Sequence, residues 1–355
     1  MGDLLNKSIQ IILHNQSPSG AYLASPDFPT YHYSWFRDGA FIAYAMDLVG
    51  EHASAARFHD WAAGVVNQHA KVARRAVRLA KNGEPLGAND FLHTRYTVGG
   101  EEAGGEEWPN FQLDGFGTWL WALGEHLCQT GSALPPAWRQ AAGLAADYLA
   151  ALWQRPCFDC WEEYPEHVHP HTLAAIYGGL QGHAALSGHD HHGTLHDIAE
   201  YLQKRAITGG HFVKYIGSDT VDASLIGLAT PYRVVDPVDP LMRQTIACIE
   251  STLVRGGGVH RYPADSYYGG GEWVLLAAWL GWYYCEIGEF DRARSILAWI
   301  EAQADENGHL PEQVPLTLND PNNYLPWVRR WGPVANPLLW SHAKYIILRA
   351  KLGAS

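Results

Sequence analysis

The sequence lacks three features that mark secreted and membrane proteins. Its 5 cysteines among 355 residues show no spacing typical of a disulfide framework. The N-terminal segment holds Asp3 and a broken apolar run, without the basic start and continuous apolar stretch of a signal peptide. None of its apolar runs approaches the roughly 20 residues that a membrane helix requires. We therefore expect a cytoplasmic protein.

The sequence is also short of positive charge and of motifs that hold phosphate or metal. Its 25 basic and 37 acidic residues give a net charge of −12, which disfavours nucleic acid and anionic membranes as partners. The glycine run at 256–258 precedes HRYPAD and not a helix, so it is not a phosphate-binding loop. Cys157 and Cys160 form a CxxC pair, but no second pair follows to complete a zinc site. We expect no metal and no other cofactor.

Aromatic residues, in contrast, are abundant. The chain has 15 Trp and 18 Tyr, within a composition of 47% hydrophobic and 17% charged residues that is typical of a globular protein. Tryptophan is often a core residue, but carbohydrate-binding clefts also present aromatic faces to the apolar faces of sugar rings. The composition therefore allows a sugar site.

The chain is predicted to be mainly helical, in hairpins joined by short turns at glycine. One opening helix, five hairpins and one closing helix make twelve helices, and pairing of the first with the last closes six hairpins into a ring. The first helix of a hairpin is apolar on most faces, as at 273–287, and the second is amphipathic, as at 290–304. This difference is expected of a ring with buried inner and half-exposed outer helices, and the lack of a fixed repeat disfavours an open solenoid. The expected helices span residues 4–14, 38–49 with 53–69, 116–129 with 136–153, 171–186 with 194–205, 223–228 with 240–254, 273–287 with 290–304, and 337–352.

Five long loops rich in glycine, proline and tryptophan lie between the hairpins. They are expected at 17–37, 83–115, 155–170, 256–271 and 308–336. Each connects an outer helix to the next inner helix, so all five should emerge at one end of the ring. Loops of this length are uncommon in a compact domain unless they are functional. The sequence therefore predicts a site on one rim.

Two of these loops carry carboxylates suited to acid–base chemistry. Glu162 and Glu163 follow Trp161 in CFDCWEEYPE, where a buried carboxyl group would have the raised pKa that a general acid needs. The alternative is a solvated acidic turn. Glu312 lies in LPEQ on another loop. Two carboxyl groups on one rim, with Arg, Asp and aromatic side chains to bind a sugar, would suit glycoside hydrolysis.

Six short motifs carry a resemblance to a known family. In chain order they are YHYSWFRDG, WPNFQLDG, CWEEYPE, HRYPADSYYGGGEW, LPEQ and NPLLWSHA. The set resembles the glucoamylase-type glycoside hydrolases of family 15. The resemblance implies an all-α fold, an (α/α)6 barrel of twelve helices in six hairpins, which agrees with the count above. It also implies that residues 1–355 form a single catalytic domain.

The resemblance assigns roles to individual residues. Glu162 matches the general acid, which protonates the glycosidic oxygen, and Glu312 matches the general base, which activates water. Tyr31 falls where the family has a tyrosine that helps to hold that water, and Trp108 falls where an aromatic supports the acid. The other residues expected to bind the substrate are Trp35, Arg37, Asp38, Trp161, Glu163, Arg261, Tyr262 and Trp273. Departures from the family's pattern, which leave the linkage preference open, are Phe36, Cys160, Ala264 and Glu272.

The family's chemistry implies inversion, with the acid and the base about 6.5 to 9.5 Å apart. We expect Glu162 to have a raised pKa, through its aromatic neighbours and the like charge of Glu163, while Glu312 stays ionised. The expected activity is exo-acting hydrolysis of short α-glucosides with release of β-D-glucose. Isomaltose and isomaltooligosaccharides, linked α-1,6, are favoured over α-1,4-linked oligosaccharides and trehalose. A non-catalytic carbohydrate-binding barrel is the alternative from another class.

Two histidine runs offer a competing, metal-dependent chemistry. HVHPH at 167–171 lies in the same loop as Glu162 and is expected to shape that loop. HDHH at 189–192 is expected to be a polar turn on the side of the ring away from the rim. A metal-dependent enzyme would lose activity with EDTA, and we predict that this one does not.

Overall fold

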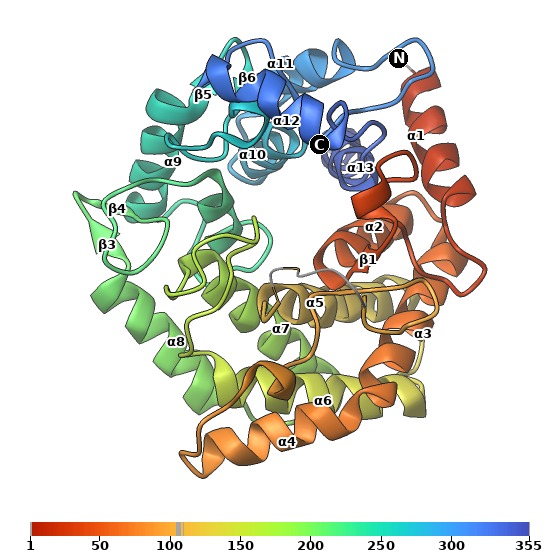
Figure 1. The fold of residues 1–355 in the computed structure, drawn as a ribbon, viewed down its shortest axis with the longest axis vertical. Helices are drawn as coiled ribbons and strands as arrows, with labels where there is room; N and C mark the ends of the chain where they lie inside the picture. Colours follow the sequence, from red (N-terminus) through yellow and green to blue (C-terminus); the bar gives the residue numbers. More distant parts are fainter. Residues whose placement is uncertain (1, 104–107, 109, 355) are drawn as a thin grey trace.

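The computed structural model describes residues 2–103, 108 and 110–354, and its helices form two concentric rings (Figure 1). Each of the six members of the inner ring contacts the next, and the last contacts the first. Most of their side chains are buried, so the core lies within and around this ring. The members are α2 (Phe36–Leu48), α5 (Asp114–Thr130), α7 (Pro170–Ser187), the 3-10 helix η3 (Ala223–Leu228), α10 (Val274–Glu286) and α13 (Leu339–Gly353).

The outer ring places one helix against each inner member. Its helices bury a single face; α11, for example, buries only Ala293, Leu297 and Ile300. α1 packs on α13, so the first and last helices of the chain form the sixth hairpin. The prediction of an all-α, (α/α)6 barrel is therefore confirmed. In the order of their inner partners, the outer helices are α3 (His52–Gln68), α6 (Pro136–Leu152), α8 (His192–Arg205), α9 (Pro240–Leu253), α11 (Phe290–Glu301) and α1 (Gly2–His14).

All twelve helices of the six hairpins are present, and the described part of the chain adds two α-helices outside the hairpins, which makes thirteen α-helices in all. The fourth inner member is a 3-10 helix of 6 residues instead of an α-helix. α4 (Ala70–Lys81) follows α3 and buries one face of small residues and leucine at helical spacing. α12 (Tyr324–Trp331) lies inside the loop expected at 308–336. Its Pro326 is in the first turn, where no intrahelical N–H donor is needed.

The close packing of α5 on α7 depends on two glycines. A Cβ atom at Gly117 would lie 2.4 Å from the carbonyl oxygen of Ala175, and one at Gly179 would lie 2.5 Å from that of Gly117. Any side chain here would push the two inner helices apart. The two glycines therefore allow α5 and α7 to pack closely in the inner ring. α5 begins at Asp114.

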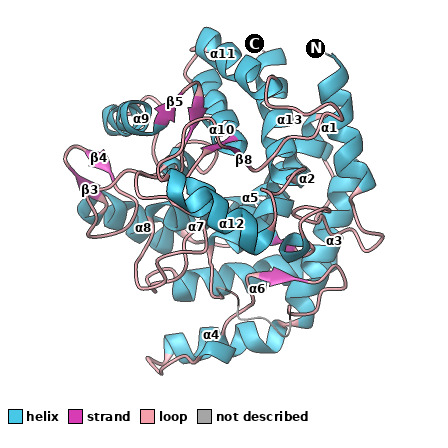
Figure 2. Cartoon of the chain, turned by 45° about the horizontal axis from the view of Figure 1, so that its top comes forward, coloured by secondary structure: helices cyan, strands magenta, loops and turns pink. Residues whose placement is uncertain are grey.

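Short antiparallel strand pairs join the loops at the rim. β1 (Ser34–Trp35) pairs with β2 (Arg95–Tyr96), and β7 (Glu272–Trp273) pairs with β8 (Gln313–Val314). β1 leads directly into α2 and β7 into α10, so these pairs fix loops where inner helices begin. Figure 2 shows α12 crossing in front of the ring in that view. The remaining pairs are β3 (Ile207–Thr208) with β4 (His211–Phe212) and β5 (Val254–Arg255) with β6 (Gly258–Val259).

Four further 3-10 helices lie in the loops: η1 (Pro29–Tyr31), η2 (Ala88–Asp90), η4 (Tyr267–Gly269) and η5 (Pro321–Asn323). Across the described ranges, none of the helices is both long and apolar enough to cross a membrane.

Candidate active site

A cavity of about 710 Å³ lies at the end of the ring where the inner helices begin. Residues from all five predicted loops line it, together with residues of α12 and the start of α13. The loops thus meet at one site, as the sequence predicts. Tyr262 is the one predicted site residue that does not line the cavity; its hydroxyl donates a 2.5 Å hydrogen bond to Glu163 Oε2. The predicted residues that do line it are Tyr31, Trp35, Arg37, Asp38, Trp108, Trp161, Glu162, Glu163, Arg261, Trp273 and Glu312.

The backbone at Glu162 forms an unusual turn around Asp159. Glu162 has φ of 67°, in the left-handed region that residues other than glycine seldom occupy. The Asp159 carboxylate accepts hydrogen bonds from the N–H groups of Trp161 and Glu163, each at 2.9 Å. The Asp159 carbonyl accepts a third from the N–H of Glu162, also at 2.9 Å. These three bonds hold the strained turn that brings Glu162 to the cavity.

A buried lysine anchors this turn from a connection that the sequence did not single out. Lys214, between α8 and η3, has its Nζ 2.9 Å from Asp159 Oδ2 and 2.7 Å from Asp222 Oδ2. Asp222 in turn accepts a hydrogen bond from the indole N–H of Trp161, 3.1 Å from each carboxylate oxygen. This Lys214 cluster (Lys214, Asp159 and Asp222) therefore holds both the backbone and the ring of Trp161.

The carboxyl group of Glu162 accepts a 2.6 Å hydrogen bond from the indole N–H of Trp35. Burial raises the pKa of Glu162 to about 7, against the opposing effects of the Arg37 charge and the Trp35 hydrogen bond. The expectation of a raised pKa is met, but the like charge of Glu163 is not among its main causes. Glu163 is itself paired, with Tyr262 at 2.5 Å and with Arg261 at 3.5 Å.

Glu312 is 4% exposed. It accepts a 3.1 Å hydrogen bond on Oε1 from the hydroxyl of Tyr31, which also lies 3.0 Å from the hydroxyl of Tyr267. Burial raises the pKa of Glu312 to about 8, although the Tyr31 hydrogen bond and the Arg261 charge lower it. The expectation that Glu312 simply stays ionised is therefore wrong, because the cost of burying its charge exceeds the help that its partners give.

Two of the arginines that line the cavity are each fixed by a buried aspartate. Arg37 donates from Nη1 to Asp114 Oδ2 at 3.1 Å, and its Nε lies 3.4 Å from Asp38 Oδ2. Arg261 donates to both oxygens of Asp265, at 2.7 and 2.5 Å. Bidentate and paired contacts of this kind fix the plane of a guanidinium group. The remaining N–H groups are therefore held in place for a ligand.

Aromatic rings form the rest of the wall. The rings of Trp161 and Trp273 lie 5.5 Å apart, and the ring of Trp340 lies 6.5 Å from that of Trp161. Trp108 meets the ring of Trp35 edge-on at 6.0 Å. Trp108 thus lies next to the indole that bonds Glu162, but within the described ranges its own indole N–H has no hydrogen-bond partner.

Sequence reasoning missed several residues of the cavity wall. Trp340 lies in NPLLWSHA and Tyr267 in the fourth loop, so the motifs contained both without indicating their place. The lining residues of α12 lie in the segment 308–336, which the sequence predicts to be a loop. Of the four departures from the family pattern, Cys160 alone lines the cavity. The missed lining residues are Ala24, Phe28, Thr30, Tyr267, Trp327, Arg330, Trp331, Leu338 and Trp340.

The histidine run at 167–171 packs into the loop that carries Glu162. His169 Nε2 lies 3.0 Å from the carbonyl oxygens of Cys157 and Tyr164, and His171 Nδ1 lies 2.9 Å from that of Ser224. These contacts fit the expected role of shaping the loop. The five cysteines are all described and all free, and burial raises the pKa of Cys160 well above its ordinary value.

Carbohydrate hydrolysis is the chemistry that these groups suit. Aromatic faces and anchored arginines bind sugars, and a pair of carboxyl groups cleaves a glycosidic bond. On a double ring of helices, they define a glycoside hydrolase with an (α/α)6 barrel. Within that class, the chain belongs to the family described as Glycosyl hydrolases family 15, whose model matches residues 2–304. The resemblance seen in the sequence is confirmed, and the place of Glu312, beyond the matched residues, comes from the structure.

Relatives cover almost the whole chain. The isomaltose glucohydrolase of Kribbella flavida is 41% identical over 99% of this chain and 93% of its own length. A solved variant of a glycosidase in complex with glucose has a TM-score of 0.95 and 42% identity, over 99% of this chain and 96% of that one. A bacterial glucoamylase complexed with acarbose has a TM-score of 0.74 at 20% identity, over 98% of this chain and 55% of that one. This last similarity supports the fold alone.

Proposed function

We propose that the chain is an exo-acting, inverting α-glucoside hydrolase that releases β-D-glucose from isomaltose and short isomaltooligosaccharides. One observation carries the proposal: two carboxyl groups from separate loops, the half-buried Glu162 and the buried Glu312, line the same cavity. Trp35 and Tyr31, from one loop, each hydrogen-bond one of them. The similarity to the isomaltose glucohydrolase of Kribbella flavida supports the α-1,6 linkage.

Glu162 is the proposed general acid. A pKa of about 7 leaves a proton on a large share of molecules at neutral pH. Because Oε1 accepts the indole N–H of Trp35, the proton is carried on Oε2. Oε2 gives this proton to the glycosidic oxygen as the bond to the anomeric carbon breaks. The charge of Arg37 then stabilises the carboxylate that forms.

Glu312 is the proposed general base. Tyr31 occupies Oε1, whereas Oε2 has no hydrogen-bond partner in the described part of the chain. Oε2 takes a proton from water as the water oxygen bonds to the anomeric carbon from the face opposite the leaving group. Attack on that face converts an α-glucoside into β-D-glucose. The separation of about 6.5 to 9.5 Å expected for inversion stays a prediction.

The proposed place of the non-reducing glucose is the buried end of the cavity. Arg37 and Arg261 are almost fully buried there, with guanidinium groups fixed by aspartates and suited to neighbouring hydroxyls. The paired rings of Trp161 and Trp273 suit the apolar face of the sugar. Trp331 of α12 is 40% exposed and lines the same cavity, so the leaving sugar lies toward it.

We further propose that residues 1–355 act as one catalytic domain on small oligosaccharides, without a metal or other cofactor in the reaction. The cytoplasmic location expected from the sequence stays a prediction.

A substrate panel followed by NMR tests the proposal. The protein is incubated with isomaltose, maltose, trehalose and soluble starch, and glucose is assayed. Isomaltose should give the highest kcat/KM, and β-glucose should be the first anomer formed. Initial α-glucose would refute inversion, and glucose from maltose or trehalose alone would refute the linkage.

The Glu312→Gln variant, purified in parallel, controls for a contaminating glucosidase. It should release no glucose above background within the same time. Release of no glucose by the wild type from any of the four sugars would instead favour the carbohydrate-binding alternative.

A further inference from the structure

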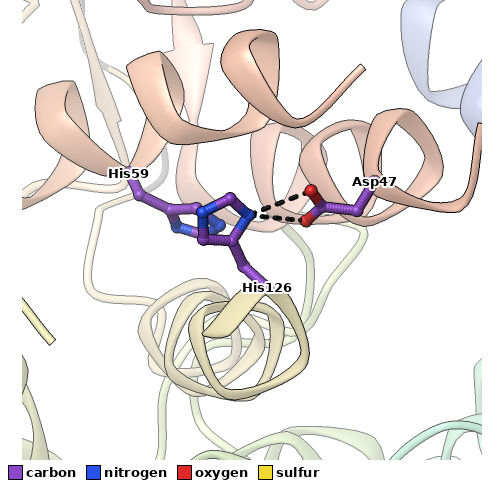
Figure 3. Close-up of side chains that lie close together, drawn as sticks. All are labelled: Asp47, His59 and His126. Atoms are coloured by element: carbon purple, nitrogen blue, oxygen red, sulfur yellow. Dashed lines mark hydrogen bonds and ion pairs between the residues drawn. The ribbon is translucent and has the colours of Figure 1, made fainter. Parts of the chain in front are cut away.

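A group of potential metal ligands lies in the barrel wall, outside the active cavity. Asp47 near the end of α2, His59 in α3 and His126 near the end of α5 are all buried. Their ligand atoms all lie within 4.8 Å of one another. Figure 3 shows the side chains of the three helices converging. α2 and α5 begin at the cavity, so the cluster lies toward the opposite end of the barrel, and none of the three lines the cavity.

The carboxylate of Asp47 contacts two imidazole rings. Nδ1 of His126 lies 2.9 Å from each carboxylate oxygen of Asp47 (Figure 3). Nδ1 of His52, at the start of α3, lies 2.8 Å from Oδ1. The side chain of His52 is 44% exposed. One carboxylate therefore has a buried imidazole on one side and an imidazole at the surface on the other.

No hydrogen bond within the described structure explains why a histidine is buried at position 59. The residue is 0% exposed, and neither of its ring nitrogens has a hydrogen-bond partner among the described residues. The rings of His126 and Trp138 lie 5.0 and 5.5 Å from it. Burying an imidazole with both nitrogens unpartnered is costly. A neutral imidazole whose nitrogens make no hydrogen bond within the described structure has a lone pair to offer a ligand.

We propose that Asp47, His59 and His126 bind one divalent transition-metal ion, with His52 as the fourth ligand from the surface side. Three imidazole nitrogens and one carboxylate oxygen form a donor set typical of zinc. A tetrahedral zinc ion with bonds of about 2.0 to 2.1 Å holds its ligand atoms about 3.3 Å apart. Asp47, His59 and His126 meet the 4.8 Å limit. His52 lies 2.8 Å from Asp47 but outside that group, so its side chain has to rotate to complete this geometry.

The binding step exchanges protons and involves no redox change. A metal ion takes the lone pair of each ligating nitrogen, so the Nδ1 protons of His126 and His52 move to solvent or to Nε2 of the same ring. The half-exposed His52 gives the ion a path from the surface.

Four protein ligands leave no open position, which is the arrangement of a structural zinc site. The ion would tie α2 and α3 of the first hairpin to α5 of the second. It takes no part in glucoside hydrolysis, so its removal should lower stability without removing the groups around the active cavity. An ion that affects stability but not catalysis agrees with the prediction that activity survives EDTA.

Zinc binding by the full chain tests the site. After EDTA treatment and removal of the chelator, titration calorimetry with Zn²⁺ should show one ion per chain with a Kd of about 1 µM or lower. Saturating Zn²⁺ should raise the Tm by about 3 °C or more, since it binds only the folded protein. The kcat on isomaltose should change less than about twofold. His59→Gln should weaken the binding at least about tenfold and remove the Tm rise.

A second histidine cluster is the main source of a false result. His183 Nδ1 lies 2.8 Å from His191 Nε2 near the HDHH run, which makes His191→Gln the matched control. This control should bind Zn²⁺ like the wild type. No binding tighter than about 100 µM, or loss of the tight site in His191→Gln but not in His59→Gln, would overturn the proposal. If His59→Gln does not fold by circular dichroism, His52→Gln at the half-exposed position replaces it, with the same expected loss.

Discussion

Trp35 and Glu162, 127 residues apart in the chain, are joined by a 2.6 Å hydrogen bond from the indole N–H to Oε1. Trp35 is held in turn by the pairing of β1 with β2, which places it opposite Arg95. The Arg95 guanidinium lies 5.6 Å from the centre of the Trp35 ring and 3.6 Å from that of Trp108. The first two rim loops therefore fix the orientation of the Glu162 carboxyl group.

Glu162→Gln should reduce kcat on isomaltose by about 10² to 10⁴-fold, because the amide cannot protonate the leaving sugar. The loss should be much smaller on 4-nitrophenyl α-glucoside, whose leaving group needs little protonation. Steady-state kinetics on both substrates measures the difference. Glu163→Gln is the control: it disturbs the pair with Arg261 and should act mainly on KM. Equal losses on both substrates would count against Glu162 as the acid.

Tyr31→Phe removes the 3.1 Å hydrogen bond to Glu312, and this bond lowers the pKa of that carboxyl group. The pKa of Glu312 should therefore rise, and less of the base is ionised at neutral pH. We expect kcat/KM at pH 7 to fall about tenfold and its rise with pH to move to higher pH. Tyr33→Phe, two residues away and outside the cavity lining, should leave the profile unchanged. A uniform loss at all pH values would mean that Tyr31 acts in some other way.

The pH dependence of kcat/KM should be bell-shaped, with its optimum between about pH 7 and 8. Glu162 must be protonated and Glu312 ionised, and burial raises their pKa values to about 7 and about 8. Below this range Glu312 gains a proton and the base is lost, whereas above it Glu162 loses its proton and the acid is lost. The two apparent values belong to the pair and not to single residues. An optimum below pH 6 at constant ionic strength would contradict these pKa values.

The double ring could be predicted from the sequence because burial leaves a signature in each helix. α10 is buried on nearly all faces, and α11 on one, and this difference is visible as apolar content. The expected helix at 53–69 ends with α3, but α4, which begins directly after His69, was not predicted. α12 was missed because proline and tryptophan made its segment look like the other loops.

The site could be predicted only where residues lie close together in the sequence. Lys214 in the sequence is indistinguishable from a surface lysine. It is buried because Asp159, 55 residues away, and Asp222 meet its Nζ. The charge state of Glu312 could not be predicted either. It depends on how far the rise in its pKa caused by burial exceeds the lowering by the Tyr31 hydrogen bond and the Arg261 charge. The burial of Lys214 and the pKa of Glu312 both depend on contacts made by the folded loops, which the spacing of residues within a motif does not indicate.

Lys214→Met should destabilise the protein by about 3 to 5 kcal/mol, because it leaves two buried aspartates without their cation. Chemical denaturation at pH 7 measures the change, and kcat should fall as the turn at Glu162 loosens. Burial opposes the ionised form of Asp159, but the charges of Lys214 and His169 and the hydrogen bonds to the carboxylate together outweigh burial, and the pKa lies below its ordinary value. The stability gained from ionised Asp159 is therefore present above about pH 4 and is lost as pH falls through the folded pKa.

The cost of Lys214→Met should consequently shrink toward acid pH. Lys204→Met is the matched control, since Lys204 pairs with Glu200 on the exposed face of α8 and should hardly affect unfolding. Lys214→Arg, which keeps the charge, should recover part of the loss. A cost equal to that of Lys204→Met would contradict an anchoring role for the Lys214 cluster.

Trp331→Ala should raise KM more for isomaltotriose than for isomaltose, by about 5- to 20-fold for the longer sugar, with kcat within about threefold. Trp331 is 40% exposed and lines the cavity, so it should contact glucose units beyond the bond that is cleaved. Leu325→Ala, on the same helix and 56% exposed but outside the lining, controls for disturbance of α12 and should change neither constant. Initial rates over a series of isomaltooligosaccharides measure the effect. A fall in kcat with unchanged KM would instead place Trp331 at the reacting bond, and the glucose that leaves would then lie elsewhere.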